Sequence, residues 1–363
     1  MTTTRSKPMT PDELDAFGTA LDTLRDEVRA TLGEADATYI RDVRSTVRYT
    51  EAAGRGLLFL SFIPPAWVAG TALLGLSKII DNMELGHNVM HGQYDWMQDP
   101  TLHSQTYEWD HICPGDGWRH SHNLMHHTFT NVLGKDRDVG YGLLRLFPEQ
   151  RWSVRNVPQI LYAAALAVNF QWGVALHDAE IDRALDGRKS AAEVVRDVAP
   201  IARKAARQIA KDYVVFPLLA GPMAPAVLLG NLGANLIRNL WTFAVIFCGH
   251  FTADAEVFPA SVVEDESRGH WYMRQLRGSS NLEGGPLFHF MTGNLSHQIE
   301  HHLFPDIPAR RYAEMAPRVR EIAARHDQHY NTGSFAAQLW SVVKRIVVHS
   351  LPSFGGSAVP AEA

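Results

Sequence analysis

The sequence predicts an all-α integral membrane protein, with four transmembrane helices in two hairpins and a helical cap on the cytosolic side. Two long apolar regions, 56–80 and 213–251, are the main observation, because a transmembrane helix needs about 20 predominantly apolar residues. The second observation is the cluster of basic residues at 178–212, which the positive-inside rule places in the cytosol. Length alone, 363 residues, would allow two ordinary domains.

Proline and glycine divide both apolar regions. Pro64-Pro65 splits the first region, and Gly221-Pro222 lies in the second. Arg238 lies inside the second region, which is costly unless the side chain snorkels or faces a polar interior. We therefore expect four spans, at about 49–63, 66–85, 213–230 and 231–251.

The apolar stretch 157–177 is ambiguous, because Asn169 and Gln171 interrupt it. An even number of crossings must separate the histidine clusters described below if they are to meet on one side of the membrane. We therefore expect 157–177 to lie in the membrane interface or to pack beneath the cap. The expected parts of the chain are a cytosolic N-terminal region 1–45, a domain 46–340 whose cap comprises 86–212 and 252–340, and a tail 341–363 that is disordered from Pro352.

Residues 10–32 predict an amphipathic helix that packs against the rest of the cytosolic part. Thr10-Pro-Asp-Glu13 fits a capping box with proline at the first helical position. Apolar residues then recur every three or four positions and form one stripe. The stripe consists of Leu14, Phe17, Leu21, Leu24, Val28 and Leu32.

Eight of the 18 histidines fall into three tight clusters, each with an i, i+4 pair. Residues four apart share one face of a helix, so each cluster can direct two imidazoles to one point. In a His-His doublet the second ring is rotated by about 100° and reaches a neighbouring point, which suits two adjacent metal ions. The candidate ligands are His87 and His91, His122, His126 and His127, and His297, His301 and His302.

His250, at the end of the last apolar run, is a ninth candidate ligand; the alternative is a satisfied histidine at the membrane interface. Cys113 and Cys248 are the only cysteines, which excludes thiolate zinc and iron–sulfur sites. Nine imidazoles are too many for one ion, and zinc has no redox chemistry. Imidazole also suits iron, so the pattern favours two irons. The isolated histidines are expected to be structural or exposed: His103, His111, His177, His270, His289, His326, His329 and His349.

Two carboxylates lie beside the clusters. Glu84 precedes His87 by three residues, but the chain has no matching second Glu-x-x-His motif of the kind that carboxylate diiron bundles use. We therefore expect Glu84, and Glu300 within the third cluster, to accept hydrogen bonds from ligand histidines. The alternative for Glu84 is an ordinary surface charge near Lys78 and Asp81.

The order, spacing and flanking apolar runs of the clusters resemble the three histidine boxes of the membrane fatty acid desaturases, over roughly residues 45–335. Residues 84–97, 138–142 and 293–305 are similar to the actinobacterial acyl-CoA desaturases that act at position 9. The Gln298–Pro305 string also occurs in front-end desaturases, but those usually begin the third box with glutamine where this chain has His297. The resemblance implies that the nine histidines bind two irons. Ile246 stands where animal members have a water-binding asparagine.

The resemblance further implies a cis desaturation of a saturated long-chain acyl-CoA such as stearoyl-CoA to oleoyl-CoA, with O₂ as co-substrate. The chain has no G-x-G-x-x-G motif after a strand and no haem, flavin or nicotinamide signature. A separate NAD(P)H-dependent reductase with a ferredoxin-like centre is therefore expected to supply electrons on the cytosolic face, beside membrane lipid. The mild net charge of −5 gives no nucleic-acid signal. Candidate substrate contacts are Arg119, Arg137, Arg188 and Lys189 with coenzyme A phosphates, and Trp118 along the acyl chain. The alternative is that the four cations are ordinary cytosolic surface charges and that Trp118 is ordinary core.

Two other hypotheses for the function remain open. A hydroxylase, or a front-end or other-position desaturase of the same superfamily, would carry the same boxes, because desaturation and hydroxylation share the first hydrogen abstraction. A histidine-lined metal transporter is more distant, because it predicts histidines within the spans. Here the clusters lie at the ends of the spans and in the long cytosolic segments.

Overall fold

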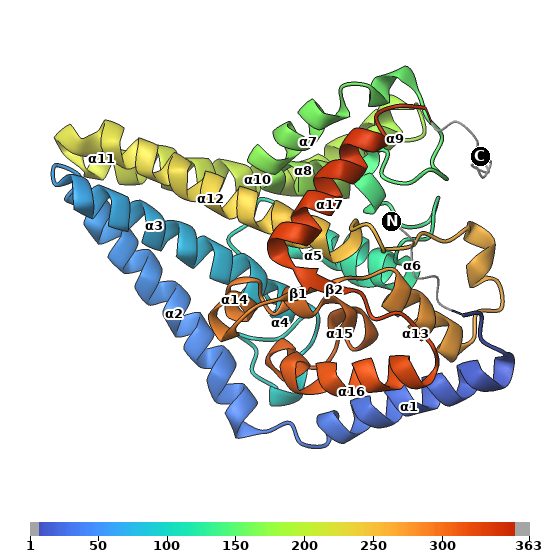
Figure 1. Cartoon of the computed structure of the whole chain (residues 1–363). Helices are drawn as coiled ribbons and strands as arrows, with labels where there is room; N and C mark the ends of the chain where they lie inside the picture. The colour runs from blue at the N-terminus through green and yellow to red at the C-terminus, as the bar shows by residue number, and fades with distance from the viewer. Residues whose placement is uncertain (1–6, 353–363) are drawn as a thin grey trace. The chain divides into compact units, whose positions relative to one another are not determined.

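The structure is a computed structural model that describes residues 7–352, apart from the side chain of Leu185. Helices dominate it, as the sequence predicts, and the only two strands among the described residues are three residues long each (Figure 1). The chain forms two compact units. Unit 1 takes residues up to 36, 120–164 and 244 onward, and unit 2 takes 37–119 and 165–243. The expected disordered tail beyond Pro352 lies outside the described residues.

Unit 1 contains most of the short elements of the chain. They are α1 (Pro11–Arg29), the main part of the π-helical η3 (Arg119–His126), α6 (His127–Phe129), η4 (Val139–Gly142), η5 (Val154–Asn156), the start of α7 (Gln159–Val168), the end of α12 (Ala224–His250), η8 (Ala260–Val263), α13 (Arg268–Arg277), β1 (Asn281–Glu283), α14 (Pro286–Met291), η9 (Leu295–His297), α15 (Gln298–Leu303), η10 (Ala309–Arg311), α16 (Tyr312–Arg325), β2 (Thr332–Ser334) and α17 (Phe335–Val348).

The helix α1 begins as the sequence predicts. Thr10 and Glu13 form the reciprocal capping box, with the Thr10 amide 2.7 Å from a Glu13 carboxylate oxygen. The predicted stripe from Leu14 to Val28 is buried, and it packs with residues of α13, α15 and α16 in one hydrophobic core. Leu32 is only half-buried and lies beyond the end of the helix.

The two strands pair in parallel and fix the position of α15 in unit 1. Leu282 of β1 pairs with Gly333 of β2. The side-chain oxygen of Asn281, at the start of β1, accepts a hydrogen bond from the Ile299 amide at 2.8 Å. The same side chain donates to Glu300 at 2.8 Å. β1 therefore holds the helix that carries the third histidine cluster.

Unit 2 contains both long and short helices. They are α2 (Glu34–Phe59, from residue 37), α3 (Pro64–Ile80), the π-helical η1 (Asp81–His87), α4 (Asn88–Met90), η2 (Asp95–Met97), α5 (Gly115–Trp118), the end of α7, α8 (Phe170–Asp178), α9 (Ile181–Leu185), α10 (Ala191–Ile209), the π-helical η6 (Ala210–Val215), α11 (Phe216–Leu219), η7 (Gly221–Met223) and α12 up to residue 243.

Helices α2 and α3 form a tight antiparallel hairpin (Figure 1). A Cβ atom added to Gly54 would lie 2.8 Å from the Leu74 amide nitrogen, and one added to Gly70 would lie 2.9 Å from the Gly54 carbonyl oxygen. Only glycine permits backbones to approach this closely. The turn that separates the two helices falls directly before Pro64-Pro65, as the sequence predicts.

A buried ionic network joins the helices of unit 2. The Asp212 carboxylate, which is fully buried in η6, binds Lys78 at 2.8 Å and Arg55 at 2.9 Å. Arg238 of α12 is 1% exposed and donates to the side-chain oxygens of Asn82 and Asn239 at 3.1 and 2.9 Å. The charge in the last apolar run thus faces a polar interior, which is one of the two alternatives that the sequence allows.

One helix among residues 7–352, Gly221–His250, is long and apolar enough to cross a membrane by itself. The pair α7 and α8 passes the same test only if counted as one span, and it bends by 100° at Asn169. The sequence predicts that the boundary between the last two spans, 213–230 and 231–251, falls at residues 230 and 231. The structure places the helix break earlier, at Ala220–Met223, and residues 230 and 231 lie inside α12. Residues 341–348 of the expected tail belong to α17. The four-span topology stays a prediction.

Candidate metal centre

The second histidine cluster lies on a π-helical turn rather than on the α-helix that its spacing predicts. His122 and His126 belong to η3, and His127 begins α6. The rings of His122 and His126 stack with centroids 5.1 Å apart, and His127 lies edge-on to His122 at 5.0 Å. The rings of His122 and His126 therefore still point in the same direction. Single π-helical turns occur frequently at functional sites.

The third cluster is divided between two helices. His297 ends η9 with φ −101° and ψ 54°, and α15, which carries His301 and His302, begins only at the next residue. The expectation that an i, i+4 spacing places His297 and His301 on one helical face is therefore wrong. The ring of His289, which the sequence suggests is merely structural, stacks on His297 at 4.5 Å.

His250, the last residue of α12, meets both of these clusters in unit 1. Its ring centroid lies 4.7 Å from that of His126 and 4.6 Å from that of His302. The Nε2 atoms of His250 and His302 are 3.1 Å apart. Ligand atoms of His126, His250 and His302 lie within 4.8 Å of one another, as do those of His127, His301 and His302. Unit 1 thus assembles two overlapping histidine triads from residues far apart in the sequence.

The first cluster belongs to unit 2, where its two members lie together. His87 ends the π-helical η1, and the rings of His87 and His91 are 4.6 Å apart. Trp118 lies edge-on to both, at 5.3 and 5.4 Å. His87 Nδ1 lies 3.2 Å from the Asn88 side-chain oxygen, and the Asn88 amide donates to the Glu84 carbonyl oxygen at 2.9 Å. These contacts fix the His87 ring and direct its Nε2 atom away from Asn88.

Asp136 orients His126, and sequence reasoning missed it. Both carboxylate oxygens of Asp136 accept from His126 Nδ1, at 3.0 and 3.1 Å, and they also accept from the amides of Asn131 and Asp138. A carboxylate on Nδ1 fixes the ring and leaves the Nε2 lone pair for a metal. The signal that could have indicated it is its position in the sequence, because Asp136 is an acidic residue only ten positions after His126.

Uncharged side chains orient the ring of His302. Its Nδ1 atom lies 3.0 Å from the Gln275 side-chain oxygen and 3.2 Å from the Thr130 hydroxyl. The Gln275 amide in turn donates to the His127 carbonyl oxygen at 2.9 Å. Nδ1 therefore carries the proton, and Nε2 faces His250 with its lone pair.

The electrostatics favour the neutral form of several of these imidazoles, and metal ligation requires that form. Burial lowers the pKa of His302 and of His122, and it lowers the pKa of His297 to about 4. Burial also acts against the charged form of His126, but the carboxylates of Asp136 and Asp138 outweigh it and raise that pKa. His126 is thus the ring with the strongest electrostatic hold on its Nδ1 proton.

The two predicted carboxylates are both fully buried, so the surface alternative for Glu84 is wrong. Glu84 accepts from the Tyr39 hydroxyl at 2.7 Å. Glu300 accepts from Asn281 and from Tyr330, each at 2.8 Å, and lies 3.9 Å from His297 Nδ1. Burial raises the pKa of Glu300 to about 7. Glu300 thus lies beside the third cluster, and its role as a hydrogen-bond acceptor for a ligand histidine stays a prediction.

The candidate substrate contacts are dispersed. Arg119 donates to the carbonyl oxygens of Ser104 and Tyr107, and Lys189 binds Asp197 and the Ala179 carbonyl oxygen. Arg188 is exposed and pairs with Asp186 at 2.8 Å. Arg137, in unit 1, is half-buried next to Asp136. Protein groups already engage Arg119 and Lys189, and Trp118 packs on the first-cluster histidines.

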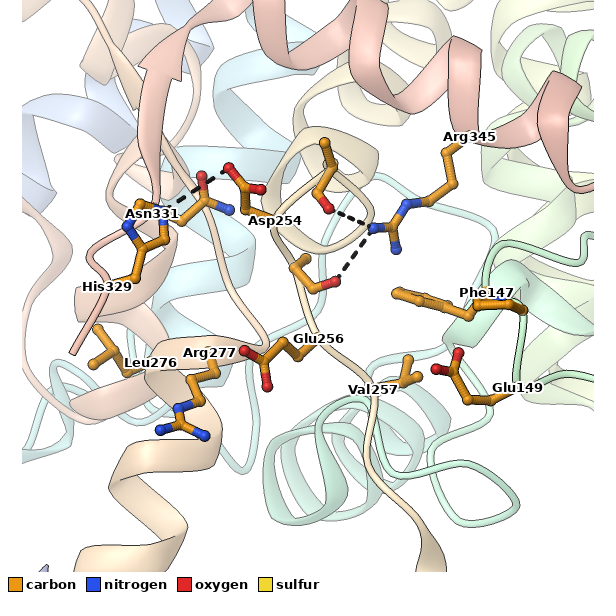
Figure 2. Close-up of a pocket in the computed structure, with 13 residues that line it drawn as sticks. Phe147, Glu149, Asp254, Glu256, Val257, Leu276, Arg277, His329, Asn331 and Arg345 are labelled. Carbon is orange, nitrogen blue, oxygen red and sulfur yellow. Dashed lines mark hydrogen bonds and ion pairs between the residues drawn. The ribbon is translucent and has the colours of Figure 1, made fainter. Parts of the chain in front are cut away.

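Unit 1 also has a pocket of about 280 Å³ that none of the predicted site residues line (Figure 2). Its wall includes the segment Ala253–Val257, which follows His250, together with Arg277, Asn331 and Arg345. Arg345 donates to the carbonyl oxygens of Ala253 and Ala255 at 2.9 and 3.3 Å. Acidic and basic side chains both face this pocket, so it presents no single sign of charge to a ligand.

The donor set fits a metal. The rings that meet in unit 1 are buried, several have their Nδ1 atoms satisfied by oxygen acceptors, and the Nε2 atom of His297 is buried without a hydrogen-bond partner among the described residues. Imidazole alone would also suit zinc, copper or nickel, so the geometry does not select the metal. As a class, the arrangement is that of a helical protein with a candidate histidine metal site.

Comparison with known proteins defines the class further. Residues 63–334 match the fatty acid desaturase family, and the chain belongs to that family. It is 45% identical over 348 residues to the NADPH-dependent stearoyl-CoA 9-desaturase of Mycobacterium tuberculosis (strain H37Rv), covering 95% of this chain and 82% of that protein. It is 24% identical over 289 residues to the sn-1 linoleoyl-lipid 6-desaturase of Synechocystis, covering 76% of this chain and 77% of that protein. The family is typically membrane-associated and uses O₂-dependent iron chemistry.

Proposed function

We propose that this protein introduces a cis double bond at position 9 of stearoyl-CoA, giving oleoyl-CoA. The observation that carries the proposal is the 45% identity to the mycobacterial stearoyl-CoA 9-desaturase across 95% of the chain. The match to the 6-desaturase of Synechocystis, at 24%, is much weaker. A front-end specificity is therefore not favoured. The overall reaction consumes the acyl chain's two hydrogens, O₂, two electrons and two protons, and releases two water molecules.

The proposed metal ligands are the nine histidines, which would bind two irons. The two triads of unit 1 support five of them. Two more lie beside the triads or their neighbours: His122 stacks on His126, and His297 lies beside Glu300. His87 and His91 are assigned from the sequence pattern and the family resemblance. When bound, a pair of irons supplies the O₂ chemistry that abstracts hydrogens from unactivated methylenes.

The chain's own residues hold and shield the centre. Asp136 keeps the proton of His126 on Nδ1, and Gln275 does the same for His302, so that both Nε2 atoms stay available. His126, His301 and His302 are buried, which excludes water from a site where it would compete with the acyl chain. Because neighbouring methylenes are chemically alike, only fixed ligand geometry can select one pair of carbons.

The proposal includes a membrane topology of four spans in two hairpins, with the site and both ends of the chain on the cytosolic side. The close α2–α3 hairpin and the apolar helix Gly221–His250 support it. A separate NADPH-dependent reductase, with a ferredoxin-like centre, would supply the electrons. The name of the mycobacterial relative supports the NADPH requirement, and the ferredoxin-like centre is an expectation of the sequence.

Reconstitution tests the proposal. The purified protein, loaded with iron in lipid nanodiscs together with a reductase, NADPH and stearoyl-CoA, should release oleoyl-CoA only when O₂ is present. Hydroxystearoyl-CoA as the product would assign a hydroxylase. A double bond at another carbon would support desaturation as the reaction but contradict position 9 as its site.

A further inference from the structure

Unit 1 presents exposed apolar side chains at the start of α7. Val154, Val157 and Leu161 are 72%, 51% and 67% exposed, and Ile160 is 43% exposed. Positions 157, 160 and 161 lie on one face of a helix. The opposite side of this helix faces the protein interior, because Gln159 is fully buried. An apolar stripe on a helix normally faces a core, whereas this one faces outward.

Helix α17 also exposes an apolar face to the outside of unit 1. It packs on unit 1 through Val342 and Ile346, which are 1% and 2% exposed. Its other side exposes Trp340, Val347 and Val348, at 68%, 49% and 53%, and Leu351 follows at 60%. Both faces of α17 are therefore apolar, but the fold of unit 1 covers only one of them.

Hydrogen bonds join these two regions into one surface. The Gln159 side chain, in the first turn of α7, donates to the Ile346 carbonyl oxygen at 2.5 Å and accepts from the Arg145 amide at 2.8 Å. The Trp152 indole donates to the Ser350 carbonyl oxygen at 2.9 Å. The start of α7 and the end of α17 are thus held next to each other. We call their exposed residues the α7–α17 surface: Val154, Val157, Ile160, Leu161, Trp340, Val347, Val348 and Leu351.

The dimensions and the charges indicate what covers this surface. Ten residues of α7 and 14 of α17 give lengths of about 15 and 21 Å, whereas a bilayer core is about 30 Å thick, so neither helix can span it. Three exposed cations accompany the apolar residues: Arg151 and Arg155 precede α7, and Lys344 lies on the same face of α17 as Val347 and Val348. An apolar helical face with tryptophan and basic neighbours is typical of helices that lie in the plane of a membrane surface.

We propose that the α7–α17 surface inserts into the headgroup region of an anionic phospholipid leaflet and anchors unit 1 in the membrane plane. The start of α7 then lies at the interface and does not begin a span. The anchor reaches the metal site through Arg345 of α17, whose guanidinium holds the carbonyl oxygens of Ala253 and Ala255 shortly after His250 (Figure 2). Insertion would thereby fix the height of the His250 segment relative to the lipid.

Depth-resolved fluorescence tests the anchor. Leu161→Cys and Val347→Cys variants of the full chain would each carry one environment-sensitive fluorophore. Glu321→Cys is the matched control, because Glu321 is 71% exposed and belongs to α16, which is not part of the α7–α17 surface. The native thiols Cys113 and Cys248 are buried and should not react. The protein would be placed in nanodiscs of phosphatidylethanolamine and phosphatidylglycerol that contain a lipid with a nitroxide near its headgroup.

The expected result is quenching by the lipid nitroxide that is several-fold stronger at 161 and 347 than at 321, with the reverse order for iodide in the water phase. Labels at 161 and 347 that iodide quenches as strongly as the control would overturn the anchor. Protection from both quenchers would also overturn it, because the surface would then be covered by protein. None of these quenching measurements depends on catalysis, so they would still test the anchor if the desaturase assignment failed.

Discussion

The second and third histidine clusters have the same pattern in the sequence, His-x-x-x-His-His, but unit 1 builds and supports them differently. The second cluster lies on a π-helical turn, and the Asp136 carboxylate orients it. The third is divided between η9 and α15, and neutral Gln275 and Thr130 orient its last member. The spacing of the ligands therefore does not determine which groups fix them. Charged support should matter more for iron retention than neutral support.

The largest effect is expected from removing a ligand itself. His301→Ala should abolish turnover and lower the iron content, because each missing imidazole leaves a coordination position that no neighbouring side chain fills. Membrane insertion should be unchanged, since His301 lies in the proposed cytosolic cap. Iron per chain by elemental analysis, with membrane fractionation as the control, checks both statements. Full activity in this variant would contradict the ligand assignment.

Asp136→Asn should have the next largest effect. An amide of similar size removes the charge that holds the Nδ1 proton of His126, and loss of such an outer partner typically costs about 10–100-fold in metal affinity. Competition with a chelator of known affinity measures the change. Asp136→Glu is the matched control, because it retains the charge and should recover part of the affinity. Equal affinities in the Asn variant and the parent protein would show that Asp136 only packs.

Gln275→Leu should weaken iron binding less than Asp136→Asn does. The substitution removes the neutral acceptor of His302 Nδ1, but the Thr130 hydroxyl, at 3.2 Å, remains within reach. The same chelator competition places the two variants on one scale. If Gln275→Leu lost more iron than Asp136→Asn, the difference between charged and neutral support would be reversed.

The smallest effect is expected at Tyr330, which touches the third cluster only through Glu300. Tyr330→Phe leaves the buried carboxylate of Glu300 with one donor fewer, which should cost about 1–3 kcal/mol in the free energy of unfolding. Iron affinity should change little, because Asn281 still donates to Glu300. Thermal unfolding together with iron titration separates the two quantities. A large loss of iron without a loss of stability would place Tyr330 closer to the metal than this account does.

Much of this arrangement could be predicted from local sequence signals. The capping box at Thr10 and the helix break before Pro64 follow from residue types at fixed positions. His250 is a candidate because it ends the last apolar run, and it meets members of two clusters. Gln275 and Asn281 could not be predicted in the same way, because their partners depend on tertiary contacts, and Asp136 had only its nearness in sequence to His126 as a signal. The π-helical turn at His122 and the break at His297 also lack a local signature, since i, i+4 spacing alone implies an α-helix.

The buried charges of unit 2 illustrate the same limit. Arg238 inside an apolar run signals a polar interior, but nothing local identifies the distant Asn82 as an acceptor beside the adjacent Asn239. Lys78 and Arg55 likewise meet Asp212 only because distant helices converge on η6. Sequence reasoning recognises that such a charge needs partners, whereas the fold determines which residues those partners are.

The most direct test of the central claim is lipid analysis after expression of the chain, with a reductase partner, in cells that lack their own position-9 desaturase. The account predicts O₂-dependent appearance of oleate-type cis monoenes, and their absence with the His301→Ala variant. Hydroxylated chains, or unchanged lipids from an iron-loaded protein that receives electrons, would contradict it.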